Sequence, residues 1–300
     1  SRLQDESQYV ELVQLSDWIT RLDPRNIEVW QFHAWNMAYN VSVMMPDLED
    51  RWRWVQDGIH LLRDEGLRYN PDSAGICHAL GWIYQHKIGA QLDTAHRFYK
   101  QQLAADMTQL FGSGHPDYSA LQKDAPRLKV LLEQCKLVPG IMQAMEEEFG
   151  TLDWRLPETH AAYWAWRGLT TARGNDAVLC HRMILQCLGE LFRSGILTFD
   201  PRGDRYERSP DIPRLPVALR RYEQVITEYP LEGMIAGRRT LLTDSTRILH
   251  RAGHETEARQ CFEEFNAMLP PPARFASYEQ FMNSPPDKYF VEPPEAGHDH

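Results

Sequence analysis

Hydrophobic residues recur at intervals of three and four positions along much of the chain, which is the spacing that gathers them on one face of an α-helix. In the middle of the chain this spacing predicts helices over Tyr118 to Leu137, with Pro126 as an interruption, over Pro157 to Ala172 and over Asp176 to Arg193. The stretch from Ile196 to Pro216 breaks the pattern, because it is rich in Pro, Asp and Arg and alternates apolar and polar residues only briefly. We therefore expect helical pairs separated by an irregular loop near residues 196–216.

The end of the chain has a different pattern. From Pro270 onward it contains seven prolines, interleaved with aromatic residues. Proline fixes φ and has no backbone N–H to donate, so such a segment favours extended structure. We expect a Pro-rich, extended tail over residues 271–300 rather than a further helix.

Besides the helical spacing, the sequence contains motifs that recur over longer intervals. The segment from Cys77 to Tyr84 contains Leu-Gly-x2-Tyr, and Ala95-x3-Tyr99 follows on the next predicted helix. Upstream, Trp30 is followed by a small residue at Ala34. Small residues at such positions let two helices approach closely, and the aromatic residues fill the remaining space.

The same signal returns near the C-terminus. Ala218-x3-Tyr222 and Ala258-x3-Phe262 are each followed by a proline twelve residues after the alanine. A proline at that place ends a helical hairpin, because it cannot continue the helix. Agreement at both ends of the chain indicates diverged repeats of one helix-pair unit.

These motifs resemble those of the tetratricopeptide repeat (TPR) family, in which each repeat is a pair of helices. The resemblance is direct over residues 10–105 and 215–270. It implies an all-α fold, a right-handed α-solenoid of TPR-like helix hairpins with long inter-repeat insertions. We therefore expect one TPR-like helical repeat domain over residues 1–270, followed by the tail.

In the TPR family the first helix of each pair lines the concave surface, and fixed positions on it contact the ligand. The resemblance carries partner-binding positions onto the following residues of this chain: Glu28, Gln31, Trp35, Tyr39, His78, Trp82, Gln85, His86, Thr243 and Arg247. Two Trp residues at equivalent positions predict an aromatic centre for that surface, and aromatic side chains are frequent binding hot spots. The function implied is a protein-protein interaction scaffold that binds a helix or an extended segment of a partner.

Other interpretations of the same residues stay open at this point. Trp35 and Trp82 could pack against an insertion, or the tail could fill the groove of a structural subunit in an oligomer or a membrane-associated assembly. A third hypothesis is an enzyme or small-molecule binder that uses the irregular middle region. It would place a pocket among His160, Tyr163, Trp164 and Trp166.

Charge and composition narrow the partners. The formal net charge of −10 and the pI near 5.6 make nucleic acid an improbable partner, because phosphate binding depends on Lys and Arg. No apolar run is long enough to cross a bilayer, so the chain as given is expected to be soluble. Membrane contact is expected only through an N-terminal anchor missing before Ser1. Segments 35–40 and 153–158 are similar to those of little-characterised bacterial TPR proteins with such an anchor, which leaves the compartment open.

Candidate chemistry is sparse. The sequence contains no Gly-rich phosphate loop, no nucleophile elbow, no zinc-protease helix motif and no CxxC pair. The five cysteines are odd in number and are expected to be buried free thiols. The pair His250 and His254 is expected to be structural rather than metal-binding, because Gly253 lies between them where the TPR resemblance implies a turn between two helices. We expect no cofactor, no metal and no catalytic residue.

Overall fold

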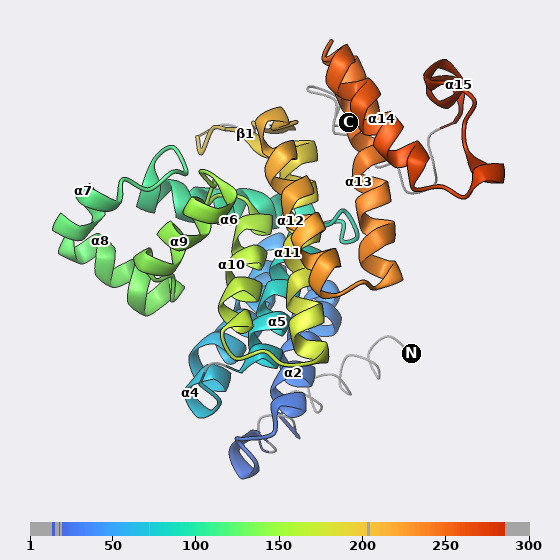
Figure 1. The fold of residues 1–300 in the computed structure, drawn as a ribbon. Helices are drawn as coiled ribbons and strands as arrows, with labels where there is room; N and C mark the ends of the chain where they lie inside the picture. The colour runs from blue at the N-terminus through green and yellow to red at the C-terminus, as the bar shows by residue number, and fades with distance from the viewer. Residues whose placement is uncertain (1–13, 16–17, 19, 72, 203–204, 286–300) are drawn as a thin grey trace. The chain divides into compact units, whose positions relative to one another are not determined.

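The computed structural model describes residues 14, 15, 18, 20–71, 73–202 and 205–285. Over these residues the protein is mostly helical, as the hydrophobic pattern predicts, with one short β-hairpin (Figure 1). The chain divides into two compact units, the first formed mainly by residues up to Cys187 and the second mainly by residues from Leu188 onward. The residues of the predicted repeat domain are therefore divided between two units.

The first unit contains two helix pairs, in which several α-helices continue directly into π-helical turns. The first pair consists of α2 (Ile27–Trp35), η1 (Asn36–Val41) and η2 (Ser42–Met44), which return as α3 (Leu48–His60), η3 (Leu61–Gly66) and α4 (Leu67–Tyr69). The two members pack along α3 and η1. A Cβ on Gly58 would lie only 2.9 Å from the Ala34 carbonyl oxygen, so this close approach requires glycine.

The second pair consists of α5 (Ala74–Trp82) with η4 (Ile83–Gly89), and of α6 (His96–Phe111). Ser73 begins α5, because its hydroxyl accepts a hydrogen bond from the backbone N–H of Ile76. The Leu-Gly-x2-Tyr segment falls on the first member of this pair. Gly81 of that segment lies where α5 packs on α10 (Pro157–Leu169), one of the most extensive helix contacts in the structure.

The middle of the chain is helical, but one predicted helix is divided. The helix expected over Tyr118 to Leu137 is α7 (Tyr118–Lys123), then α8 (Ala125–Val130) with the π-helical η5 (Leu131–Cys135). The break falls at Asp124, whose carboxylate accepts a hydrogen bond from the backbone N–H of Arg127 and begins α8. After α9 (Pro139–Phe149), helices α10 and α11 (Asn175–Ser194) match the other two predicted helices closely.

The predicted loop near residues 196–216 was wrong in its first half. Strands β1 (Ile196–Phe199) and β2 (Tyr206–Ser209) form an antiparallel hairpin in which Leu197 pairs with Arg208 and Phe199 pairs with Tyr206. The short apolar alternation at 197–199 was the trace of this strand, since alternation is the strand pattern. Leu197 and Tyr206 are buried.

The second unit continues with three helices and a helical tail. Its elements are η6 (Ile212–Arg214), α12 (Leu215–Glu228), α13 (Glu232–Arg251), α14 (Glu255–Ala267), η7 (Pro271–Ala273) and α15 (Tyr278–Asn283). The prediction of an extended tail was therefore wrong at α15. Ser277 caps this helix, and the prolines are spaced widely enough to allow six residues to form a helix. Residues 286–300 of the predicted tail lie outside the described residues.

Candidate functional site

Six of the ten predicted partner-binding residues line one hollow of about 530 Å³ in the first unit. They come from the first members of the two helix pairs: Glu28, Gln31, Trp35, Tyr39, His78 and Trp82. Phe32, which the sequence analysis did not single out, lines the same hollow. We call this surface the aromatic groove. Three of its rings are unusually open to solvent for their size, since Phe32 is 49% exposed, Trp35 44% and Trp82 39%.

The rings of the aromatic groove form a continuous series of contacts. Trp35 lies between Phe32 and Tyr39, with ring centroids 6.4 Å and 5.9 Å away. The imidazole of His86 lies 5.7 Å from the Tyr39 ring and stacks on Trp82 at 4.6 Å with an interplanar angle of 13°. Such contacts hold large apolar surfaces in fixed positions, which lowers the entropy lost when a ligand binds to them.

Helical spacing explains why these side chains share one face. Phe32, Trp35 and Tyr39 are separated by three and four positions on α2 and η1, and Trp82 and His86 by four positions on α5 and η4. Gln31 joins the two helices, because its Nε2 donates a hydrogen bond of 2.9 Å to the carbonyl oxygen of Gly75. The groove is therefore built on two connected helices rather than on loops.

The histidine and tyrosine side chains in and beside the aromatic groove are mainly uncharged at neutral pH. Burial lowers the pKa of His78, with a partly opposing effect of Asp176, and burial also lowers the pKa of His86. Both imidazoles are therefore mainly neutral at pH 7. Burial raises the pKa of the Tyr39 hydroxyl, which stays protonated. Glu28, at the edge of the groove, is the exposed carboxylate of this set.

Two predicted residues, Gln85 and His86, lie beside the groove rather than in its lining. Gln85 donates a hydrogen bond of 3.2 Å to the Oε1 of Gln186 on α11. His86 bounds a second, smaller hollow of about 290 Å³, which it shares with Tyr39. In that hollow the buried Lys87 pairs with Asp93, and Arg51 lies 3.6 Å from the same carboxylate.

Thr243 and Arg247, the remaining two predicted residues, differ from the expectation. Both are buried within the second unit, at 8% and 7% exposure, so neither lies on an open surface. The Nη2 of Arg247 donates to the carbonyl oxygens of Phe281, at 3.3 Å, and Ser284, at 3.2 Å, and its guanidinium lies 4.6 Å from the centre of the Phe281 ring. The chain's own tail occupies this face of α13, because α15 packs there.

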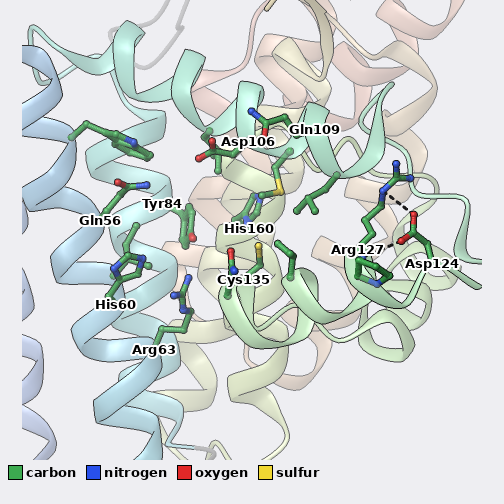
Figure 2. Close-up of a pocket in the computed structure, with 18 residues that line it drawn as sticks. Gln56, His60, Arg63, Tyr84, Asp106, Gln109, Asp124, Arg127, Cys135 and His160 are labelled. Atoms are coloured by element: carbon green, nitrogen blue, oxygen red, sulfur yellow. Dashed lines mark hydrogen bonds and ion pairs between the residues drawn. The ribbon is translucent and has the colours of Figure 1, made fainter. Parts of the chain in front are cut away.

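A larger cavity, which we call the polar cavity, lies elsewhere in the first unit and has a volume of about 680 Å³. Figure 2 shows side chains from α3, η3, η4, α6, α8, η5 and α10 converging on it. Its polar lining consists of Gln56, His60, Arg63, Tyr84, Asp106, Gln109, Asp124, Arg127, Gln134, Cys135 and His160. Its apolar lining consists of Trp52, Ile59, Leu103, Met107, Leu110, Pro126 and Val130.

His160 is the deepest titratable group of the polar cavity. Its Nε2–H donates a 2.8 Å hydrogen bond to the Trp154 carbonyl oxygen, and its ring stacks on Tyr84 at 4.9 Å. Burial lowers the pKa of His160 to about 4, so the imidazole is neutral at pH 7 and Nδ1 keeps its lone pair. Nδ1 is buried without a hydrogen-bond partner in the described part of the chain.

Tyr84 and Cys135 keep their protons in this cavity. Burial raises the pKa of Tyr84 to about 12 and that of the Cys135 thiol to about 11. The thiol is therefore a poor nucleophile, because the thiolate is the reactive form.

The structure agrees only in part with the third hypothesis, which places a small-molecule pocket in the irregular middle region. Of the four residues expected around a pocket in the middle region, His160 lines the polar cavity. Tyr163 and Trp164 are fully buried, and the Tyr163 hydroxyl donates to the Lys136 carbonyl oxygen and accepts from the backbone N–H of Val138. Trp166 packs edge-on against Phe149. Tyr163 and Trp164 belong to the core around α10 and Trp166 is half-buried, so neither Tyr163 nor Trp164 faces an open pocket.

Comparisons with known proteins do not identify the chain: no protein-family model, no curated protein and no solved structure matches it. The resemblance to the TPR family therefore stays a prediction from the motifs. Among the helices that the structure describes, none has the length and apolar character needed to cross a bilayer. The fold and the site define a mostly helical protein with an exposed aromatic groove and a separate polar cavity.

Proposed function

We propose that the protein is an interaction scaffold that binds a helix or an extended segment of a partner protein in the aromatic groove. One observation carries the proposal: three large rings, Phe32, Trp35 and Trp82, are left open to solvent around a common hollow. Contiguous exposed apolar surface of this kind marks binding sites more often than chance exposure. The TPR-like solenoid that the motifs predict would present such a surface on its concave side.

Covering the exposed rings of the groove supplies a favourable hydrophobic contribution to binding. Each ring has roughly 150 to 250 Å² of surface, so covering the exposed parts of the three rings removes about 300 Å² from water. At about 25 cal/mol per Å² this contributes about 7 kcal/mol before the costs of association. Gln31 and His78 supply polar groups that can fix the register of a bound segment.

Peptide display followed by calorimetry tests the proposal directly. Segments selected on the intact chain would be titrated into wild type and into the double variant Trp35→Ala/Trp82→Ala. Loss of two hot-spot rings should weaken binding by at least about 100-fold. The control is Leu132→Ala/Leu231→Ala, which removes two similarly exposed apolar side chains outside the groove and should leave affinity unchanged.

The outcomes separate the proposal from its alternative. Equal binding by wild type and the Trp double variant, with both folded by circular dichroism, would place the interaction elsewhere. The alternative is a structural subunit whose tail fills the groove, and it is favoured only by the contact between the tail and Arg247 in the second unit. Deleting residues 271–300 should raise groove affinity if the tail competes for the groove, and should leave it unchanged if the scaffold proposal holds.

A further inference from the structure

The polar cavity contains one charge that no residue described by the structure neutralises. Arg63 is held by Asp64 through two hydrogen bonds, from Nε at 2.9 Å and from Nη2 at 2.7 Å. Arg127 is paired with Asp124 at 3.5 Å. Asp106, on α6, makes no hydrogen bond or ion pair with any residue that the structure describes. Of the four charged residues that line the cavity, three therefore have a partner of opposite charge, and Asp106 has none within the described part of the chain.

The negative charge of Asp106 acts on the interior of the cavity. It contributes to the raised pKa of Tyr84 and of Cys135, so its carboxylate lies within electrostatic range of both. Asp106 keeps an exposed side, and the burial of the rest of its side chain raises its pKa. A cation beside it would gain a charge-assisted contact that no described residue of the chain provides.

The other polar groups of the cavity also favour a ligand that donates hydrogen bonds over a ligand that accepts them. Nδ1 of the neutral His160 offers a lone pair without a partner among the described residues. His60 is kept mainly neutral, because burial and the charge of Arg63 lower its pKa. An anionic ligand would meet the Asp106 carboxylate, while the cations Arg63 and Arg127 are already engaged by acidic residues of the chain.

The remaining wall is apolar and continues from Asp106 along the same helix. Leu103, Met107 and Leu110 lie on one side of α6 at spacings of three and four, and Ile59 and Val130 line the cavity from α3 and α8. A volume of about 680 Å³ is in the range of small-molecule sites. A ligand that fills it therefore needs an apolar body as well as a charged group.

We propose that the polar cavity binds a small organic amine, with its ammonium group on the Asp106 carboxylate and its apolar body against Met107, Leu110 and Val130. The site is separate from the aromatic groove, so this inference does not depend on the proposed function. His160 and Tyr84, both buried, line the cavity beside this site.

Calorimetry with matched probes tests the charge requirement. The probes are tryptamine, phenethylamine and cyclohexylmethylamine, each compared at pH 7 with the alcohol that has hydroxyl in place of the amine, and tryptamine also with indole-3-acetate. At least one amine should bind the intact chain about tenfold or more tightly than its alcohol, since a charge-assisted hydrogen bond is lost in the alcohol. Indole-3-acetate should bind more weakly than either.

Variants then locate the site. Asp106→Asn should remove the preference for the amine over its alcohol, whereas Glu147→Gln, which removes an exposed carboxylate outside the cavity, should retain it. Leu110→Trp should reduce the binding of amine and alcohol alike by filling the cavity. The proposal is overturned if no amine in the panel binds more tightly than its alcohol, or if Asp106→Asn keeps the full preference while the protein remains folded.

Discussion

The contact between α5 and α10 can be tested by adding a single carbon atom. A Cβ at Gly81 would overlap the Met183 sulfur and would lie 3.0 Å from the Ala161 carbonyl oxygen. Met183 is itself buried, at 2% exposure, and the carbonyl belongs to the backbone of α10, so neither can move far. We therefore expect Gly81→Ala to push the two helices apart or to force Met183 out of its preferred conformation.

The expected magnitude follows from two opposing effects. Replacing Gly by Ala inside a helix favours folding by about 1 kcal/mol. Overpacking a filled contact costs about 1 to 3 kcal/mol, and the confined backbone oxygen favours the upper half of that range. The variant should thus lower the free energy of unfolding by about 1 to 2 kcal/mol. Gly140→Ala is the matched control, because a Cβ there meets no atom within 4 Å, and it should be neutral or slightly stabilising.

Urea unfolding followed by tryptophan fluorescence measures this effect in the relevant unit. All nine Trp residues precede Cys187, so their fluorescence reports on the first unit without a contribution from Trp in the second. Met183→Ala should cost less stability in the Gly81→Ala background than in wild type, since it removes the overlapping atom. A Gly81→Ala protein as stable as wild type, or more stable, would refute the tight packing of α5 on α10.

Two further predictions concern the second unit and use hydrogen exchange of its amides. Arg247→Met keeps the apolar stem but removes the donors to the Phe281 and Ser284 carbonyl oxygens, so amides of α15 should exchange about tenfold faster, and unchanged exchange would contradict the anchoring role. Burial raises the pKa of Asp244 to about 6, and Arg193, which opposes this effect, is shared with Glu190. The folded-state pKa lies above the unfolded value of 3.8, so the stability from this group is present below pH 4 and is lost as pH rises through 6. Relative to Asp244→Asn, wild type should lose about 2 to 3 kcal/mol of α13 stability between pH 4 and pH 7, and a constant difference would refute the shifted pKa.

The positions of the helices and the pairing of Trp residues in the aromatic groove could be predicted because they depend on local spacing. The three-and-four spacing placed both ends of α11 to within one residue, and it placed α10 correctly at its start and three residues too long at its end. The repeat register put Trp35 and Trp82 at equivalent positions of successive helix pairs, and both line one hollow. The position of each helix is set by side chains within one or two turns of each other. The equivalence of Trp35 and Trp82 is set by one register that two helices share. That the groove binds a partner stays a prediction, because spacing carries no information about what fills a hollow.

Features that depend on distant contacts could not be predicted in this way. The polar cavity draws its lining from helices as far apart in the sequence as α3 and α10, and no local pattern relates Arg63 to Asp106. The hairpin of β1 and β2 has only four residues in each strand, which is too short for alternation to stand out among prolines and charges. The TPR-like register predicts a ligand-binding position at Arg247, but α15 folds back on α13 and covers it.

The consecutive helical segments α5 and η4 connect the aromatic groove, the polar cavity and the site of the Gly81→Ala variant. On α5 and η4, Trp82 and His86 contribute to the aromatic surface, while Tyr84, two residues from each, faces the polar cavity on the other side. Residues two apart on a helix point in roughly opposite directions, so the same backbone must hold both surfaces. Gly81 lies on the same segment, where α5 packs closely on α10. A Gly81→Ala variant that remains folded is therefore expected to weaken both peptide binding in the groove and amine binding in the cavity, whereas Trp35→Ala/Trp82→Ala should affect only the groove and Asp106→Asn only the cavity.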